Sequence, residues 1–344
     1  MQSFFAHLTF ACLSFVHVAT TSVVSSRTDL RPILTDPSNY WTANTVVSFP
    51  EDPDFVNATE RWTIYDSPSY AAAVTPATEA DVVKAVTLSR THAVPFLATG
   101  GHHGYTTTLG GLQAGLAIDM SQLNSVTIDN SAATLTIGGG TRFRDIMDPI
   151  YAAGFDIRKL LSGAYSSNAD LFWGIRGAGA NLGVIVSATY KPEPLANGGI
   201  LTSVDVMFPA SMNTSYFNAL QSYNGTIPAK LAASTSIAYN ASTGEAEILA
   251  SWIYSGTREE ALEAMAPMLD LNPPLVSISD VPWNQMNSAT GFGLDAVTCE
   301  PDKTRSLYGV NLRTLSASTC ISTFNKMATF YDAFPEAQSS SILI

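Results

Sequence analysis

Apolar and polar residues alternate in short blocks along the first half of the chain, and they predict helices and strands in turn. Residues 78–90 are apolar at positions 82, 83, 86 and 88, a spacing that indicates a helix. Thr78 and Asp81 stand where a helix start needs a side-chain cap. The other expected elements of this half are strands over 93–98, 116–120, 125–128 and 133–137, a helix over 141–153, and a buried strand over 182–189.

From about residue 194 the pattern changes to longer strands separated by helices. The expected strands cover 201–208, 231–239 and 245–254, and the expected helices cover 212–223, 257–268 and 319–334. Residues 340–344 also have a strand pattern, whereas residues 27–60, rich in Pro, Asn and Asp, predict an extended arm. Helices and strands in this order predict the α+β class.

Composition limits the choice of function. With 344 residues, 46% of them hydrophobic and 13% charged, the chain is a folded protein long enough for two domains. Its net charge of -12 disfavours nucleic acid or an anionic membrane as partner, because phosphate binding needs clustered Lys and Arg.

The N-terminus resembles a signal peptide. Residues 1–26 contain no Asp, Glu, Lys or Arg, and the apolar run 4–19 has the length of a signal-peptide core. The run is short for a membrane anchor and contains His and Thr, so we expect secretion without stable membrane association. Four glycosylation sequons agree with a secreted glycoprotein, at Asn57, Asn213, Asn224 and Asn240.

Between the predicted strand 93–98 and the apolar run 117–120 lies a glycine-rich turn with two histidines. We expect Gly100, Gly101 and Gly104 to adopt positive φ and to present backbone N–H groups to an anion. His102 and His103 lie inside the turn, within reach of a bound cofactor. Adjacent histidines without nearby Cys, Asp or Glu make a poor zinc site, so no metal is predicted.

Two further glycine-bearing segments follow this turn. A strand runs into Gly138–Gly140, which is either a second anion contact at a helix start or a tight packing turn. Residues 168–186 contain the run Asp-Leu-Phe-Trp-Gly-Ile-Arg-Gly-Ala-Gly-Ala-Asn-Leu-Gly. Together the three segments resemble the FAD-linked oxidoreductases of the vanillyl-alcohol-oxidase and berberine-bridge-enzyme type, their fungal members especially. The resemblance is specific over residues 60–190 and looser to residue 344.

This resemblance implies a two-part FAD-binding domain of the PCMH type, followed by a substrate domain with an antiparallel sheet and helices. It implies covalent FAD, with His103 as the attachment residue and His102 as the competitor. The remaining implied cofactor contacts are Thr99, Gly100, Gly101, His102 and Gly104 at the pyrophosphate, and Asn181, Gly183 and Val184 along the flavin.

The resemblance also implies domain boundaries and two departures. We expect a signal peptide over 1–26, the FAD-binding domain over 27–192 and the substrate domain over 193–344. Relatives have a longer segment near 154–167, often with a second flavin-linked cysteine, and here residues 155–167 hold none. The C-terminal part also looks incomplete. Either the chain is an incomplete or mis-spliced product of a larger gene, or it is a shortened relative that has lost flavin chemistry.

The implied function is FAD-dependent oxidation of an alcohol, amine or phenolic secondary metabolite, with dioxygen reoxidising the flavin. The alternatives are an extracellular carbohydrate oxidase of the same fold and an inactive remnant without flavin. No motif fixes the catalytic base, for which Trp283, Asn284 and Tyr308 are guesses. Cys299 and Cys320 are left after the signal segment, and they either pair or remain separate thiols.

Overall fold

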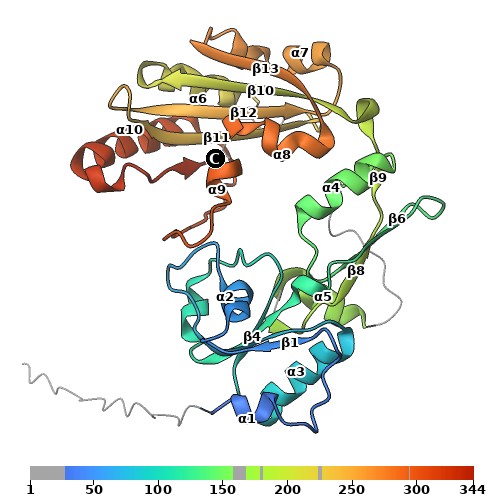
Figure 1. Ribbon diagram of the computed structural model, residues 1–344. Helices are drawn as coiled ribbons and strands as arrows, with labels where there is room; N and C mark the ends of the chain where they lie inside the picture. Colours follow the sequence, from blue (N-terminus) through green and yellow to red (C-terminus); the bar gives the residue numbers. More distant parts are fainter. Residues whose placement is uncertain (1–27, 158–167, 179–180, 224–226, 294) are drawn as a thin grey trace, which may run out of the picture.

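The computed structural model describes residues 28–157, 168–178, 181–223, 227–293 and 295–344. Its first sheet has the order β1-β2-β4-β3 and lies in the lower half of Figure 1. Strands β2 (Tyr70–Thr75), β4 (Gly115–Asp119) and β3 (Phe96–Thr99) are parallel, and β1 (Val46–Ser48) joins the edge antiparallel. Strand β4 is buried on both faces, and its residues before Asp119 are apolar or glycine, as is usual for a central parallel strand.

Helix α3 (Glu79–Thr91) crosses over between β2 and β3 and begins where the sequence predicts. The Thr78 side chain accepts a hydrogen bond from the Asp81 backbone N–H, so the predicted cap is confirmed. The predicted apolar face is only partly right. Val82 and Ala85 are buried against the sheet, whereas Val83 is 59% exposed.

The predicted extended arm over 27–60 is wrong. This stretch contains α1 (Arg31–Leu34), β1 and α2 (Pro53–Thr59), and each of the two helices has proline in its first turn. Proline fixes φ near the helical value and lacks the N–H that a helix start leaves unbonded. The same prolines that suggested an arm therefore begin helices.

The second sheet has the order β5-β6-β8 and is antiparallel. It consists of β5 (Val126–Asp129), β6 (Thr134–Gly138) and β8 (Ser187–Tyr190). The buried strand expected over 182–189 starts only at Ser187, and its residues alternate between exposed and half-buried. Helix α4 (Phe143–Ala152) follows β6, while β7 (Phe155–Asp156) and β9 (Glu193–Pro194) form a short pair. Helix α5 (Ala169–Ala178) covers much of the predicted flavin-contact run.

The upper half of Figure 1 is a five-stranded antiparallel sheet of order β13-β10-β12-β11-β14. Three of its strands were predicted: β10 (Ile200–Pro209), β11 (Leu231–Asn240) and β12 (Glu245–Tyr254). Its edges are β13 (Leu275–Pro282), which was not predicted, and β14 (Ile342–Leu343), within the strand expected at 340–344. Helices α6 (Asn213–Ser222), α7 (Arg258–Leu269) and α10 (Ala317–Ala333) pack on this sheet. The α+β class is confirmed.

The two halves share a small hydrophobic core. Ile146 and Ile150 of α4 pack with Leu135 of β6, and the same cluster includes Leu201 of β10 and Trp283. Trp283 opens the short η6 turn (Trp283–Gln285) ahead of α8 (Met286–Ala289). This contact places α8 opposite α4. The boundary at residues 192/193 stays a prediction.

Cys299 and Cys320 are two separate thiols. Cys320 of α10 is buried in the hydrophobic core between that helix and the five-stranded sheet, while Cys299 is exposed just after α9 (Asp295–Thr298). Among the helices that the structure describes, none has the length and apolarity needed to span a bilayer.

Candidate functional site

The three glycine-bearing segments meet in the folded chain. Thr99 ends β3, and a Cβ added to Gly100 would lie 3.1 Å from the Gly139 carbonyl oxygen. Gly139 in turn donates its N–H to Val186 O at 2.8 Å. The histidine turn, the triple glycine and the residues just before β8 therefore lie side by side.

Gly138–Gly140 is a packing turn rather than an anion contact. Its N–H groups donate to Ser125 O (2.9 Å), Val186 O (2.8 Å) and Leu123 O (2.9 Å). A Cβ on any of the three glycines would overlap a backbone carbonyl oxygen. Glycine stands here because neighbouring backbones pass too closely for a side chain, and its donors are already used.

The expected positive φ at Gly100, Gly101 and Gly104 is wrong. In this turn the left-handed residue is His102, with φ of 60°. A non-glycine residue in this region is uncommon and needs support from its surroundings. Two contacts with the segment after α2 give that support. His102 Nδ1 lies 2.6 Å from Glu60 O, and the His102 carbonyl accepts the Trp62 N–H at 3.2 Å.

Protein oxygens lie near both ring nitrogens of His102, although only Nδ1 is within hydrogen-bond distance of one. Its Nε2 lies 3.4 Å from Asp119 Oδ1, within ion-pair range but long for a hydrogen bond, and the two side chains are 11% and 7% exposed. Burial raises the pKa of Asp119, but contacts with His102 and Ser121 outweigh it and leave the pKa below the ordinary value. Both ring nitrogens face protein oxygens and not open space, so the ring anchors the turn, although the buried Nε2 makes no hydrogen bond.

His103 has the opposite surroundings. Its ring is exposed, with no hydrogen-bond partner among the described residues, and lies 5.9 Å from the Trp62 ring, tilted by 35°. The part of the ring that the protein covers loses water, which lowers the pKa of His103, and the nearby Arg142, His102 and Arg144 lower it further. The imidazole therefore stays neutral at a lower pH than an ordinary histidine, and the neutral form is the nucleophilic one.

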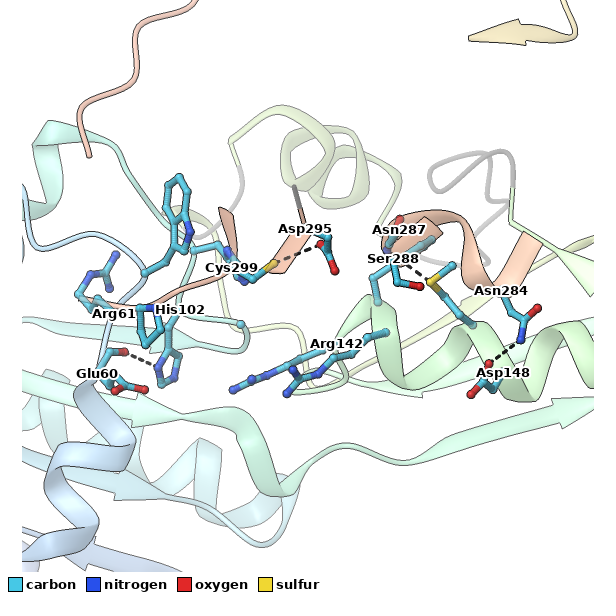
Figure 2. Close-up of a pocket in the computed structure, with 17 residues that line it drawn as sticks. Glu60, Arg61, His102, Arg142, Asp148, Asn284, Asn287, Ser288, Asp295 and Cys299 are labelled. Carbon is cyan, nitrogen blue, oxygen red and sulfur yellow. Dashed lines mark hydrogen bonds between the residues drawn. The ribbon is translucent and has the colours of Figure 1, made fainter. Parts of the chain in front are cut away.

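A cavity of about 680 Å³ opens beside this turn (Figure 2). Gly101, His102 and His103 line one side, and residues of α4 and α8 line the other. Of the three guessed bases, only Asn284 lines it, with Nδ2 donating to Asp148 Oδ1 at 2.7 Å and Oδ1 buried without a partner. Trp283 is buried against Phe143, at 6.2 Å between rings, and Tyr308 is 84% exposed and lines no part of the cavity.

Sequence reasoning missed the segment 298–305, which lines the cavity near His103 through Cys299 and Pro301. The Trp62 indole N–H donates to Thr298 O at 2.5 Å. Arg305 donates to Trp62 O at 2.6 Å and stacks its guanidinium 4.5 Å from the Trp62 ring centre. Ile64 and Lys303 are also joined through their backbones at 3.1 Å. These residues lie some 240 positions apart, so no local pattern could have paired them.

The other predicted cofactor residues do not line the cavity. The Thr99 hydroxyl is buried without a partner, and Gly104 O accepts a hydrogen bond from Arg61 at 2.5 Å. Asn181 is exposed and bonds Ala178 O at 2.8 Å. Gly183 is also exposed, with open space where a Cβ would stand, and Val184 packs against the core of the first sheet.

These residues fit a dinucleotide cofactor. Thr99 supplies an unused hydroxyl at the end of a parallel strand, and the turn after it has few side chains and presents a neutral imidazole. Parallel strands commonly bind ligands beyond their carboxyl ends. In the described part of the chain no three His, Cys, Asp or Glu side chains converge.

Comparisons with known proteins agree with this geometry. The family model described as an FAD binding domain matches residues 70–166. The FAD-linked oxidoreductase OXR1 of Pyricularia oryzae is 40% identical over 341 residues, covering 87% of this chain and 67% of that protein. FAD-linked oxidoreductase fogF of Aspergillus ruber is 37% identical, covering 91% and 72%. The chain thus spans about two thirds to three quarters of the length of these relatives.

Solved structures show the same fold. A berberine-bridge-enzyme-like protein of Physcomitrella patens superimposes with a TM-score of 0.67 at 20% identity, covering 83% of this chain and 73% of that one. A xylooligosaccharide oxidase from Myceliophthora thermophila gives 0.61 at 21% identity, covering 77% and 65%. Fold and site together define a flavin-dependent oxidoreductase. The chain belongs to the family of fungal FAD-linked oxidoreductases. The internal shortening near 154–167 falls largely outside the described residues.

Proposed function

We propose that the chain carries FAD covalently on His103 and oxidises a small organic molecule, an alcohol, amine or phenol, with dioxygen as electron acceptor. The observation that carries the attachment is the contrast between the two histidines. The His103 ring faces the cavity without a hydrogen-bond partner in the described structure, whereas His102 has its Nδ1 2.6 Å from Glu60 O and its buried Nε2 turned to Asp119, 3.4 Å away. A nucleophile needs an accessible lone pair, which favours His103.

In this proposal the turn holds the dinucleotide. Thr99 and the backbone of Gly100, Gly101 and Gly104 bind the pyrophosphate. The bound cofactor supplies a hydride acceptor that dioxygen can reoxidise. Val184 and its neighbours Asn181 and Gly183 lie along the flavin, as the family resemblance implies.

The wall formed by α4 and α8 binds the substrate. Asn284, Asn287 and Ser288 offer amide and hydroxyl groups at one end, and Phe143 and Met147 offer an apolar surface. The buried, unpartnered Asn284 Oδ1 is suited to accept a substrate hydrogen bond. We assign no catalytic base.

The test is the colour of the purified chain. Wild-type protein should be yellow, and the flavin should remain with the protein after denaturation. H103A should release flavin into the acid supernatant, while H102Q should retain the covalent bond. A colourless wild type would contradict the proposal, and retention by H103A would move the attachment to His102.

A carbohydrate oxidase is the second candidate, because the amide groups of Asn284 and Asn287 also suit sugar hydroxyls. Oxygen uptake with cellobiose but not with benzyl alcohol would favour it. An inactive remnant without flavin is the third, and the colourless outcome above identifies it.

We also infer secretion from the residues 1–26, which lie outside the described part of the chain. Expression in a fungal host should release the protein into the medium with a new N-terminus near residue 27. Retention in the cell with Met1 intact would contradict the inference.

A further inference from the structure

Arg142 lies in the cavity with its charge uncompensated. Among the described residues no carboxylate oxygen lies within ion-pair distance of its guanidinium, and only its backbone N–H is bonded, to Asp145 Oδ2 at 2.9 Å. Figure 2 shows Arg142 between His102 and Glu60 on one side and Asn287 and Ser288 on the other. A free guanidinium in this position is available to a ligand.

The other arginines of the cavity are engaged elsewhere. Arg61 is buried and donates to Gly104 O at 2.5 Å, and Arg144 has its Nε 3.8 Å from Asp145 Oδ1. Three carboxylates line the cavity, those of Glu60, Asp148 and Asp295, and among the described residues none of them forms an ion pair with Arg142. Asp148 accepts from Asn284 at 2.7 Å, and Asp295 accepts from the Cys299 thiol at 3.3 Å.

Positive potential is therefore local to the His103 end of the cavity. After burial, the charges of Arg142, His102 and Arg144 are what lower the pKa of His103. The whole chain has a net charge of -12, which repels anions in general. A cluster of positive charge on the exposed wall of the cavity, on a molecule that is otherwise acidic, marks the place where an anionic group is favoured.

We propose that Arg142 binds the anionic group of the molecule oxidised in this cavity, so that the substrate is a small organic acid such as a carboxylate. That this molecule is oxidised rests on the proposed function, whereas binding of its anionic group to Arg142 does not require bound flavin. The pyrophosphate of the cofactor is also an anion that Arg142 could bind, so the experiment must distinguish it from an anionic substrate. A guanidinium pairs with either group through two parallel hydrogen bonds.

The test compares benzoate with benzamide, which has the same shape and no charge. Calorimetry on the purified full chain should give at least about tenfold tighter binding of benzoate, the contribution expected of one charge-assisted hydrogen bond. R142Q should abolish this preference and R142K should keep part of it. R90Q removes the same charge from the exposed face of α3 and should leave the preference unchanged.

The flavin content of the same preparations separates the two sources. If R142Q loses flavin while its benzoate preference persists, Arg142 binds the cofactor, and the substrate assignment is overturned. Equal binding of benzoate and benzamide by the wild type would also overturn it. A colourless wild type that still prefers benzoate through Arg142 would refute the proposed function and leave the anion site standing.

Discussion

His102 and His103 are adjacent in the chain, yet their rings face different surroundings. The left-handed backbone at His102 turns its side chain towards Asp119 and Glu60 and leaves His103 at the cavity. The sequence alone could name the pair but could not rank it from burial, because the ranking depends on Asp119 of β4 and Glu60 after α2. The contacts of His102 with Glu60 and Trp62 explain how it tolerates a backbone conformation that glycine usually adopts.

The first prediction concerns the pH dependence of flavin attachment. The pKa of His103 is lowered, so its neutral, nucleophilic form persists below pH 6.5, and attachment should fall only when pH drops through that lowered pKa. R144Q removes a nearby positive charge, so it should raise the pKa and move the midpoint to higher pH.

In-gel flavin fluorescence measures this midpoint after FAD is added to protein made under riboflavin limitation. R90Q is the matched control, since Arg90 lies exposed on α3. A midpoint that R144Q leaves in place would contradict the electrostatic account of His103.

At the scale of elements, patterns along the chain placed most helices and long strands correctly. Helix α3 has its cap, and β10, β11 and β12 match their apolar alternation within a residue or so. Strand β13 was missed because it is an edge strand with half of its residues exposed, and an alternating apolar pattern appears only where one face of a strand is buried.

The second prediction concerns acid stability at the start of α3. Burial raises the pKa of Asp81, but hydrogen bonds from Thr78, Thr42 and Thr45 outweigh it and hold the pKa at about 2. Because the folded pKa is lowered, this stabilisation is present above pH 3.8 and lost as pH falls towards 2. It amounts to about 2 kcal/mol.

Urea unfolding at pH 7 should therefore show D81N destabilised by about 2 kcal/mol relative to the wild type. The difference should shrink as pH falls from 4 to 2. Asp54 lies exposed in the first turn of α2, and D54N should cost far less. Equal losses in both variants would argue against the hydrogen-bonded network as the cause.

The third prediction concerns the core beneath α10. Phe324 is buried with Phe208 and Trp252 between α10 and the five-stranded sheet. F324A should lower the free energy of unfolding by about 3–5 kcal/mol, because it removes buried apolar surface and leaves a cavity. F334A, at the exposed end of the same helix, should cost less than 1 kcal/mol or so by chemical unfolding. Similar losses in both would contradict this packing.

At the scale of the whole molecule, two contacts join the halves of the fold. One is the apolar cluster of α4, Leu201 and Trp283, and the other is the 298–305 segment on Trp62. The cavity lies between them, so its shape depends on pairings between distant parts of the chain. Local sequence patterns predict the helices and strands on each side of the cavity, but they do not predict which side chains meet across it.

The last prediction tests whether the 298–305 segment holds the cavity closed. R305A removes two hydrogen bonds to backbone carbonyls, of Trp62 and Glu300, and the stacking on the Trp62 ring, all outside the main cores. Hydrogen exchange should therefore quicken by about tenfold or more at Ile64 and Asp302, whose N–H groups bond across this contact. Without one such hydrogen bond, the free energy of local opening is lower by about 1.4 kcal/mol, which corresponds to a tenfold faster exchange. Exchange in β10–β12 should stay unchanged. R313A, at an exposed arginine beyond the segment, should alter neither. If R305A instead speeds exchange throughout the five-stranded sheet, the segment is part of the cooperative core, and the cavity has no separate closure.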